Sequence, residues 1–552
     1  MPWRRQHLHI CFRASTVRFC SPSSCSGQNC TAINDNTYSK VRVTHRLEGM
    51  SMKPNIIVVM TDQQRADVSA REGFPIDTTP FMDSLARSGV WFDKAYTTSP
   101  ICVAARCSML TGRYPGAHRV RENGSVQHIS YTHDLFDIMK KQGYATALIG
   151  KNHSHLKPDS ASIDHYFGLE HYGDAGPFRN EDERAFIEWL SRCSVNQTEP
   201  APFPLQSQNP YRGVTEALEW IEGVKEHPFF LWLSFPEPHN PYQVPEPYYS
   251  MFPPETLPPL QSSAQALETK GFKWQWCRKQ GEHFNPAFDA DIGRVRSNYF
   301  GMLRLLDDQL RRFVTGLESQ ELMKNTILVF VSDHGDFVGE YGLIKKGPEL
   351  PDILLRIPMF WIGPGIQRDE RPHAAHVSLA DLMPTLCEAV GTEIPAGVQG
   401  RSLWPLLTGA EYPAQEFSSV YGEHGFGGLE FSEEDGLDIS RFGKRTETEQ
   451  GAIVRFDELN TVTQAGFMRT VRKGDWKLNV SMQGNVQLYR ISSDPLELNN
   501  RHGEPDTKDI EAELFHELVI WMMRSQDPLP YPGQYAYKKD ARNYLAPYSI
   551  RG

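Results

Sequence analysis

The 552-residue sequence has no long hydrophobic run and few cysteines for its length. Apolar segments such as 54–60 and 327–331 are far shorter than the ~20 residues of a membrane-spanning helix, so we expect no membrane span. The cysteines number nine, and four of them fall in the first thirty residues. An odd and sparse set does not resemble a secreted disulfide framework, so we expect reduced thiols.

The chain also lacks an excess of basic residues. Lysine and arginine total 57 against 68 aspartate and glutamate residues, which gives a net charge of -11. This balance argues against a broad nucleic-acid-binding surface, so no nucleic-acid partner is expected. An acidic protein that handles an anionic substrate must concentrate positive charge locally.

Residues 1–34 contain no Asp or Glu, but they carry four arginines and many serines. They also lack the apolar core of a secretory signal, so we expect a cytoplasmic protein. Two interpretations stay open: an organellar transit segment, or an extension upstream of a true start at Met50 or Met52, which we favour. Either way, residues 1–52 are expected to lie outside the fold.

Apolar runs typical of buried strands alternate with helical patterns along residues 53–415. Strands are expected at 54–60, 145–149, 229–235, 326–331 and 358–362, and helices at 79–86, 132–142, 213–225 and 291–317. This alternation predicts an α/β domain with a largely parallel sheet. Four of the strands run into ionisable residues, namely Asp62, Lys151, His239 and Asp333. Because ligands bind beyond the carboxyl ends of such strands, we expect one site there.

The pattern changes after residue 415. Residues 430–450 form an acidic, weakly patterned insertion, and 467–480 with 486–490 predict short antiparallel strands with a turn at 473–475. We therefore expect a small C-terminal subdomain over 416–552, covered by a helix at 510–525. A Pro-rich loop at 250–290 is expected near the substrate, where Trp274 and Trp276 could stack on a sugar.

Cys102 lies in the most informative segment. A loop containing Pro100 leads into a helix that is expected to begin at or just after Cys102, which places the thiol in the positive potential of a helix N-terminus. Arg106 follows one turn later on the same face. A lone cysteine on a helix is commonly a packing residue, so the wider string carries the argument.

The string Cys-x-Ala-x-Arg, followed by Leu-Thr-Gly-Arg-Tyr-Pro at 110–115, resembles the signature of the sulfatase family in the alkaline-phosphatase-like superfamily. Matching motifs continue in the family's order over most of residues 53–500, at 54–57, 150–153, 332–339 and 488–499. The resemblance implies a large, mostly parallel central sheet flanked by helices, with a small C-terminal antiparallel-sheet subdomain. It also implies a sulfuric ester hydrolase whose Cys102 is oxidised to formylglycine by a separate formylglycine-generating enzyme. Ala104 and Ala105 stand where the family most often has Pro and then Ser.

By the same resemblance, the positions that match the family's four metal ligands are Asp62, Gln63, Asp333 and His334. Oxygen ligands with one imidazole suit a hard divalent cation, with Ca²⁺ favoured and Mg²⁺ or Mn²⁺ as alternatives. The family often has Asp at position 63 and Asn at position 334. Either pair alone, Asp62 with Gln63 or Asp333 with His334, is as compatible with a turn at the end of a strand as with a metal site. Together with Cys102, the two pairs favour the metal site.

The resemblance also implies the remaining roles. Arg106 would stabilise the nucleophile and the ligand carboxylates, and Lys151 would hold the sulfate. His153 would take the proton released during sulfate expulsion, His239 would protonate the leaving oxygen, and Lys346 would bind sulfate. Two further candidates for the substrate pocket are Asn123 and His155.

The expected reaction is hydrolysis of a sulfate monoester, with a carbohydrate sulfate as the preferred substrate. The nearest alternative is a phosphonate monoester or phosphodiester hydrolase of the same superfamily. The alternative from another class is a non-catalytic binding protein that retains the fold.

Overall fold

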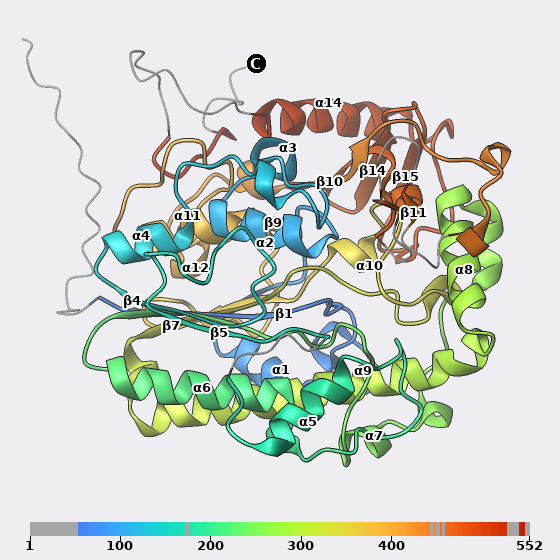
Figure 1. Cartoon of the computed structure of the whole chain (residues 1–552). Helices are drawn as coiled ribbons and strands as arrows, with labels where there is room; N and C mark the ends of the chain where they lie inside the picture. The colour runs from blue at the N-terminus through green and yellow to red at the C-terminus, as the bar shows by residue number, and fades with distance from the viewer. Residues whose placement is uncertain are drawn as a thin grey trace, which may run out of the picture. The chain divides into compact units, whose positions relative to one another are not determined.

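A central sheet of seven strands organises the computed structural model, which describes residues 53–172, 177–441, 446–447, 453–454, 459–526 and 540–546 (Figure 1). Its strands, in spatial order, are β2 (Val90–Phe92), β8 (Met359–Ile362), β7 (Thr326–Ser332), β1 (Asn55–Thr61), β6 (Phe229–Ser234), β4 (Ala145–Gly150) and β5 (His165–Gly168). The predicted N-terminal extension and part of the predicted acidic insertion lie outside the described residues.

The sheet is mostly parallel, as predicted. The central strand β1 runs parallel to both β6 and β7, and all seven of its residues are buried, which explains its unbroken apolar run. The strand expected at 358–362 is present as β8, but it runs antiparallel to β7. The sequence patterns had not indicated β2 and β5.

Helices cover both faces of the sheet (Figure 1). Since side chains alternate along a strand, Ile57 and Val59 pack toward one helical layer, and Ile56 and Val58 pack toward the other. The first layer contains α1 (Pro80–Arg87), α6 (Asn209–Val224) and α9 (Phe288–Ser319), and the second contains α2 (Cys102–Thr111), α4 (Leu135–Lys141) and α11 (Leu382–Ala389). Among the described residues, none of the helices combines the length and apolar character needed to cross a bilayer.

A second sheet, antiparallel and four-stranded, follows in the C-terminal part of the chain. Its order is β10 (Ser419–Gly427), β13 (Gly466–Lys473), β14 (Trp476–Ser481) and β15 (Val486–Arg490), and α14 (Lys508–Arg524) packs on it. The predicted strands, covering helix and turn are confirmed, with Gly474 in the left-handed region at φ 57°. The remaining short elements are β3 (Ala95–Tyr96), β9 (Val377–Ser378), β11 (Thr446–Glu447), β12 (Ile453–Val454), α3 (Pro115–His118), α5 (Glu181–Leu190), α7 (Tyr248–Met251), α10 (Asp352–Leu355), α12 (Trp404–Thr408) and α13 (Thr461–Gln464).

The expectation that Trp274 and Trp276 stack on a sugar was wrong. Both lie on α8 (Phe272–Phe284) and are only 1% and 2% exposed. Trp274 packs against Phe337 and Tyr341 with ring centroids 5.6 and 5.1 Å away. This part of the predicted loop insertion is a helix that contributes to the core.

Gly150 ends β4 directly before Lys151, and its conformation allows a close backbone approach. Its φ is 107°, and a Cβ at this position would lie 1.8 Å from the carbonyl oxygen of Ser234 on β6. We expect Gly150→Ala to lower the free energy of unfolding by about 2–4 kcal/mol, from backbone strain and overpacking together. Chemical denaturation measures this change.

Gly143→Ala is the matched control, since Gly143 also has a positive φ of 81° but no atom within 4 Å of an added Cβ. Its cost is expected to be about 1 kcal/mol, from backbone strain alone. Equal losses in the two variants would contradict the proposed steric contact.

Candidate active site

Cys102 is the first residue of α2 and is 1% exposed. Its Sγ lies 3.1 Å from Nε2 of His334 and 3.9 Å from Oδ1 of Asp62. Burial and the Asp62 carboxylate favour the neutral thiol, but the positive charges of Lys151, Lys346 and His334 outweigh them. The pKa of the Cys102 thiol is therefore lowered well below its ordinary value.

Arg106 joins the ends of several strands from one turn further along α2. Its guanidinium donates to Asp62 at 3.0 Å and to Asp333 at 2.9 Å, and both carboxylates are fully buried. The same side chain donates to the backbone oxygen of Lys151 at 2.9 Å and to the hydroxyl of Ser234 at 2.8 Å. One buried cation thus fixes groups that follow β1, β4 and β7 and the last residue of β6.

Four side chains present possible metal-binding atoms within 4.8 Å of one another: Asp62, Cys102, Asp333 and His334. Nδ1 of His334 lies 2.9 Å from the backbone oxygen of Gly335, which can only accept. Nδ1 therefore carries a hydrogen, and Nε2 faces the cluster. Burial opposes the charged form of His334, but Asp333 and Cys102 outweigh it and raise the pKa of the imidazole, so Nε2 would have to release its proton to bind a cation. Two carboxylates and an imidazole in this arrangement fit a divalent cation.

Gln63, the other predicted ligand, lies beside this cluster. Its amide oxygen accepts from Nζ of Lys346 at 2.9 Å, and its amide nitrogen donates to the Asp336 carboxylate. An amide oxygen has a second lone pair, so ligation by Gln63 is compatible with the contact to Lys346. Its backbone N–H donates to Asp333 at 2.9 Å.

Asp336 is a residue of this region that the sequence reasoning did not single out. It is buried, accepts from the hydroxyl of Tyr242 at 2.7 Å, and orients the amide of Gln63. Burial raises the pKa of the Asp336 carboxyl. Its position three residues after Asp333, within the motif at 332–339, was the available signal.

His239 and Lys346 meet on another side of the cluster. Nζ of Lys346 lies 3.0 Å from Nε2 of His239, whose ring stacks on that of His171 at a centroid distance of 4.0 Å. Burial, His171 and Lys346 all lower the pKa of His239 well below its ordinary value, so the imidazole is neutral and accepts from Lys346. No sequence motif indicated His171.

Lys151 and His153 follow β4. The Lys151 ammonium is fully buried and contacts the Asp62 carboxylate. That carboxylate has a pKa held well below its ordinary value, because the charges of Lys151 and Arg106 outweigh the opposing effect of burial. His153 is half-buried, and its ring lies 6.4 Å from that of His171.

The two further candidates differ in placement. Asn123 is exposed, and its side-chain oxygen accepts from the backbone N–H of Val103 at 3.5 Å, next to the nucleophile. His155 instead has a buried side chain whose Nε2 lies 3.1 Å from Asp134. The structure therefore brings the side chain of Asn123 to the first turn of α2, whereas His155 pairs with Asp134 and its backbone contacts Cys107 further along that helix.

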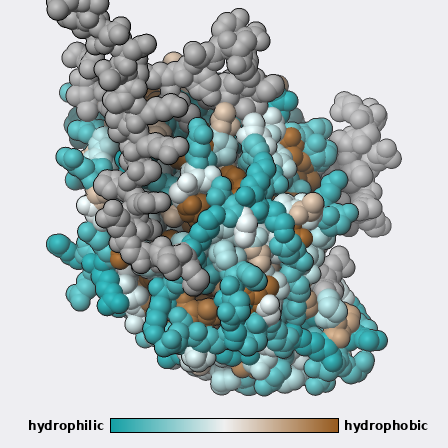
Figure 2. Space-filling view, turned by 90° about the vertical axis from the view of Figure 1, so that its left-hand side faces the viewer, coloured by the Kyte–Doolittle hydropathy of each residue, from teal (hydrophilic) through white to brown (hydrophobic). Residues whose placement is uncertain are grey.

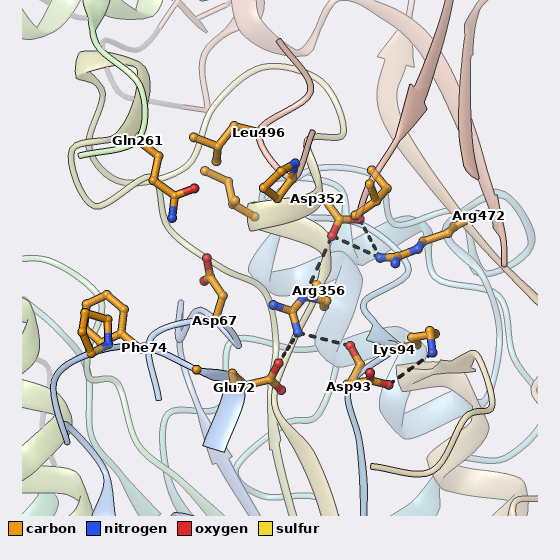
Figure 3. Close-up of a pocket in the computed structure, with 15 residues that line it drawn as sticks. Asp67, Glu72, Phe74, Asp93, Lys94, Gln261, Asp352, Arg356, Arg472 and Leu496 are labelled. Atoms are coloured by element: carbon orange, nitrogen blue, oxygen red, sulfur yellow. Dashed lines mark hydrogen bonds and ion pairs between the residues drawn. The ribbon is translucent and has the colours of Figure 1, made fainter. Parts of the chain in front are cut away.

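A separate cavity of about 370 Å³ lies between the segments after β1 and the C-terminal sheet (Figure 3). Its charged walls pair with one another: Arg356 donates to Glu72 at 2.7 Å, and Arg472 contacts Asp352 at 3.3 Å. None of the predicted site residues lines it. We interpret these charges as a structural network between the two sheets.

Comparison with known proteins identifies the fold and the family. The model of the Sulfatase family matches residues 54–392. The chain belongs to the Sulfatase family. It is accordingly a hydrolase of the sulfatase type, as the sequence motifs predicted. The family match and the sulfatase relatives support hydrolysis of a sulfuric ester.

Proteins similar to this sulfatase include sulfatases in sequence and a phosphonate hydrolase in fold. An arylsulfatase of Clostridium perfringens is 29% identical over 416 residues, which cover 68% of this chain and 82% of the relative. The phosphonate monoester hydrolase of Silicibacter pomeroyi shares the fold with a TM-score of 0.69 at 21% identity, covering 86% of this chain and 96% of its own. A structure in complex with D-glucosamine-2-N,6-O-disulfate has a TM-score of 0.65 at 19% identity, covering 87% and 100%.

The donor set predicts that this sulfatase is stabilised by a divalent cation. Prolonged chelation is expected to lower Tm, and Ca²⁺ or Mn²⁺ at about 100 times Kd is expected to restore about 2.7 kcal/mol. Asp333→Asn should abolish the metal-dependent shift. Asp164→Asn, which alters a carboxylate outside the cluster, should retain it, and an unchanged shift in Asp333→Asn would refute the site.

Proposed function

We propose that this sulfatase cleaves a sulfate monoester with residue 102 converted to formylglycine and with one divalent cation bound by Asp62, Gln63, Asp333 and His334. The observation that carries this proposal is the convergence of Cys102 and Arg106, from α2, with two buried carboxylates and the ammonium of Lys151, which follow the ends of three separate strands. Ca²⁺ is our preferred cation, with Mg²⁺ and Mn²⁺ as alternatives.

The two absent groups would supply distinct chemistry. Hydrated formylglycine provides two hydroxyls on one carbon, one to attack sulfur and one whose deprotonation expels sulfate. A divalent cation held by the four proposed ligands would offset the charge on the sulfate oxygens and would favour ionisation of the attacking hydroxyl. The thiol of Cys102 stands in the place of that hydroxyl.

Arg106 and Lys151 arrange the nucleophile. Arg106 holds Asp62 and Asp333 in place through one guanidinium, so neither carboxylate can turn away from the cluster. The ammonium of Lys151 lies against Asp62 and near residue 102, where it would neutralise a sulfate oxygen. Lys346 would bind a second sulfate oxygen from the side of Gln63.

Proton transfer to the leaving oxygen falls to His239, which lies beside Lys346. The imidazole is neutral without substrate, but an incoming sulfate group adds negative charge beside it and so raises its pKa. The added proton would sit on Nε2, because Nδ1 already faces the backbone oxygen of Asn240. Nε2 would then no longer accept from Lys346 and would donate to the oxygen that departs from sulfur. His153, half-buried on another side, would accept the proton released during sulfate expulsion.

A carbohydrate sulfate is our preferred substrate class. The support is the solved structure with D-glucosamine-2-N,6-O-disulfate, which shares this fold across 87% of the chain. Maturation would require a formylglycine-generating enzyme as a partner.

Mass spectrometry of the peptide that spans residue 102 tests the modification. In protein made with an active maturation enzyme, we expect sulfur and two hydrogens to be exchanged for one oxygen. Cys102→Ala should lose at least about 10³-fold in kcat, because the nucleophile is absent.

Cys107→Ala is the matched control on the same helix. Burial raises the pKa of the Cys107 thiol to about 12, so it is a packing residue, and its variant should keep most of the activity. An intact thiol at residue 102 in fully active protein would contradict the proposed nucleophile. An inactive protein that binds sulfate esters without turnover would favour the non-catalytic alternative.

Parallel rates on an aryl sulfate and on a phosphonate monoester of the same phenol separate the two enzymatic alternatives. The shared fold with a phosphonate monoester hydrolase makes the comparison necessary. We expect kcat/KM for the sulfate to exceed that for the phosphonate by at least about tenfold, a difference of about 1.4 kcal/mol in the transition state. A faster phosphonate reaction would replace the proposed substrate class.

A further inference from the structure

Two arginines lie against one aromatic ring beside the segment that carries Cys102. The guanidinium carbons of Arg121 and Arg469 lie 4.5 and 4.9 Å from the centroid of Phe467, which is half-buried. Phe467 and Arg469 are two residues apart on β13, so their side chains share one face of the C-terminal sheet. Arg121 reaches the same ring from the loop that follows α3.

Positive charge is in excess at this point. Arg469 pairs with Glu423 at 3.1 Å, and the other carboxylate oxygen of Glu423 accepts from the backbone N–H of Gly116 at 2.6 Å. Within the described part of the chain, the guanidinium of Arg121 has no ion-paired or hydrogen-bonded acceptor, and the Nε atoms of both arginines are buried without partners. Burial and the adjacent Arg469 lower the pKa of Arg121, although the Glu423 carboxylate opposes this shift. Two like charges beside one carboxylate leave one positive charge uncompensated.

Two contacts join the segments that carry these arginines to the residues that flank Cys102. The backbone N–H of Glu423 donates to Thr98, four residues before Cys102, at 2.9 Å. Two residues after Arg121, the side chain of Asn123 accepts from the N–H of Val103. The loop that carries Arg121 and the strand β10 that carries Glu423, the partner of Arg469, therefore flank the start of α2.

Resting on the proposed function, we propose that Arg121, with Arg469 and Phe467, forms a specificity subsite for a second anionic group on the leaving alcohol. A carboxylate or a second sulfate would supply the acceptor that Arg121 lacks, in a charge-assisted hydrogen bond. Lys151 and Lys346 would hold the reacting sulfate, so the two anionic groups of one substrate have separate cations. The favoured substrates are then sulfate esters of acidic or multiply sulfated alcohols.

Two matched pairs of substrates test the subsite. The first pair is 4-carboxyphenyl sulfate and 4-carbamoylphenyl sulfate, and the second is sulfated glucuronic acid and sulfated glucose. The readout is the ratio of kcat/KM for the anionic ester to that for its neutral partner. Arg121→Gln is expected to lower this ratio about tenfold, and Arg121→Lys should lower it less, because the charge remains. Added salt should reduce the ratio in the protein without a substitution and should have little effect on the ratio in Arg121→Gln.

Arg192→Gln is the control for the loss of one positive charge, because Arg192 is 76% exposed on another surface. Its ratio should equal that of the unmodified sequence, and the Tm of each variant shows whether the fold is retained. A ratio in Arg121→Gln equal to that of the unmodified sequence would overturn the subsite while leaving the proposed function intact. Absence of turnover for all four esters by protein with confirmed formylglycine would overturn the proposed function and the subsite with it.

Discussion

The buried guanidinium of Arg106 is the interaction on which the site depends. The guanidinium is fully buried, so its charge requires the two carboxylates of Asp62 and Asp333. Those buried carboxylates in turn require the positive charge of the guanidinium. Because the partners follow strands that are distant in sequence, one side chain fixes the relative position of several strand ends. Removing any member would leave a buried charge without compensation, so the cluster acts as a unit.

Much of the fold was predictable because buried parallel strands have a simple signature. Residues 56–60 of β1 are all apolar and are enclosed by strands on both sides, and the polar residues after several strands meet at one edge. The direction of β8 was not predictable, since an apolar run of four residues fits either orientation. The burial of Trp274 depends on Phe337 and Tyr341, which are more than sixty residues away in sequence.

The candidate site likewise contains residues that the sequence could predict and residues that it could not. The family motifs indicated the residues that cluster around Cys102, but not the side chains that position them. Asp336, His171 and Arg121 matter through partners brought close only by folding, such as Tyr242 for Asp336 and Phe467 for Arg121. The division of the chain at residue 415, the cytoplasmic location and the individual catalytic roles stay predictions.

The burial of α2 has a consequence for biosynthesis. All ten residues of this helix are enclosed, and Cys102 is 1% exposed. A second protein cannot reach that sulfur once the helix has docked between the sheet and its neighbours. Conversion of the thiol would therefore have to happen on a nascent or unfolded chain, so that chain collapse sets the time available for it.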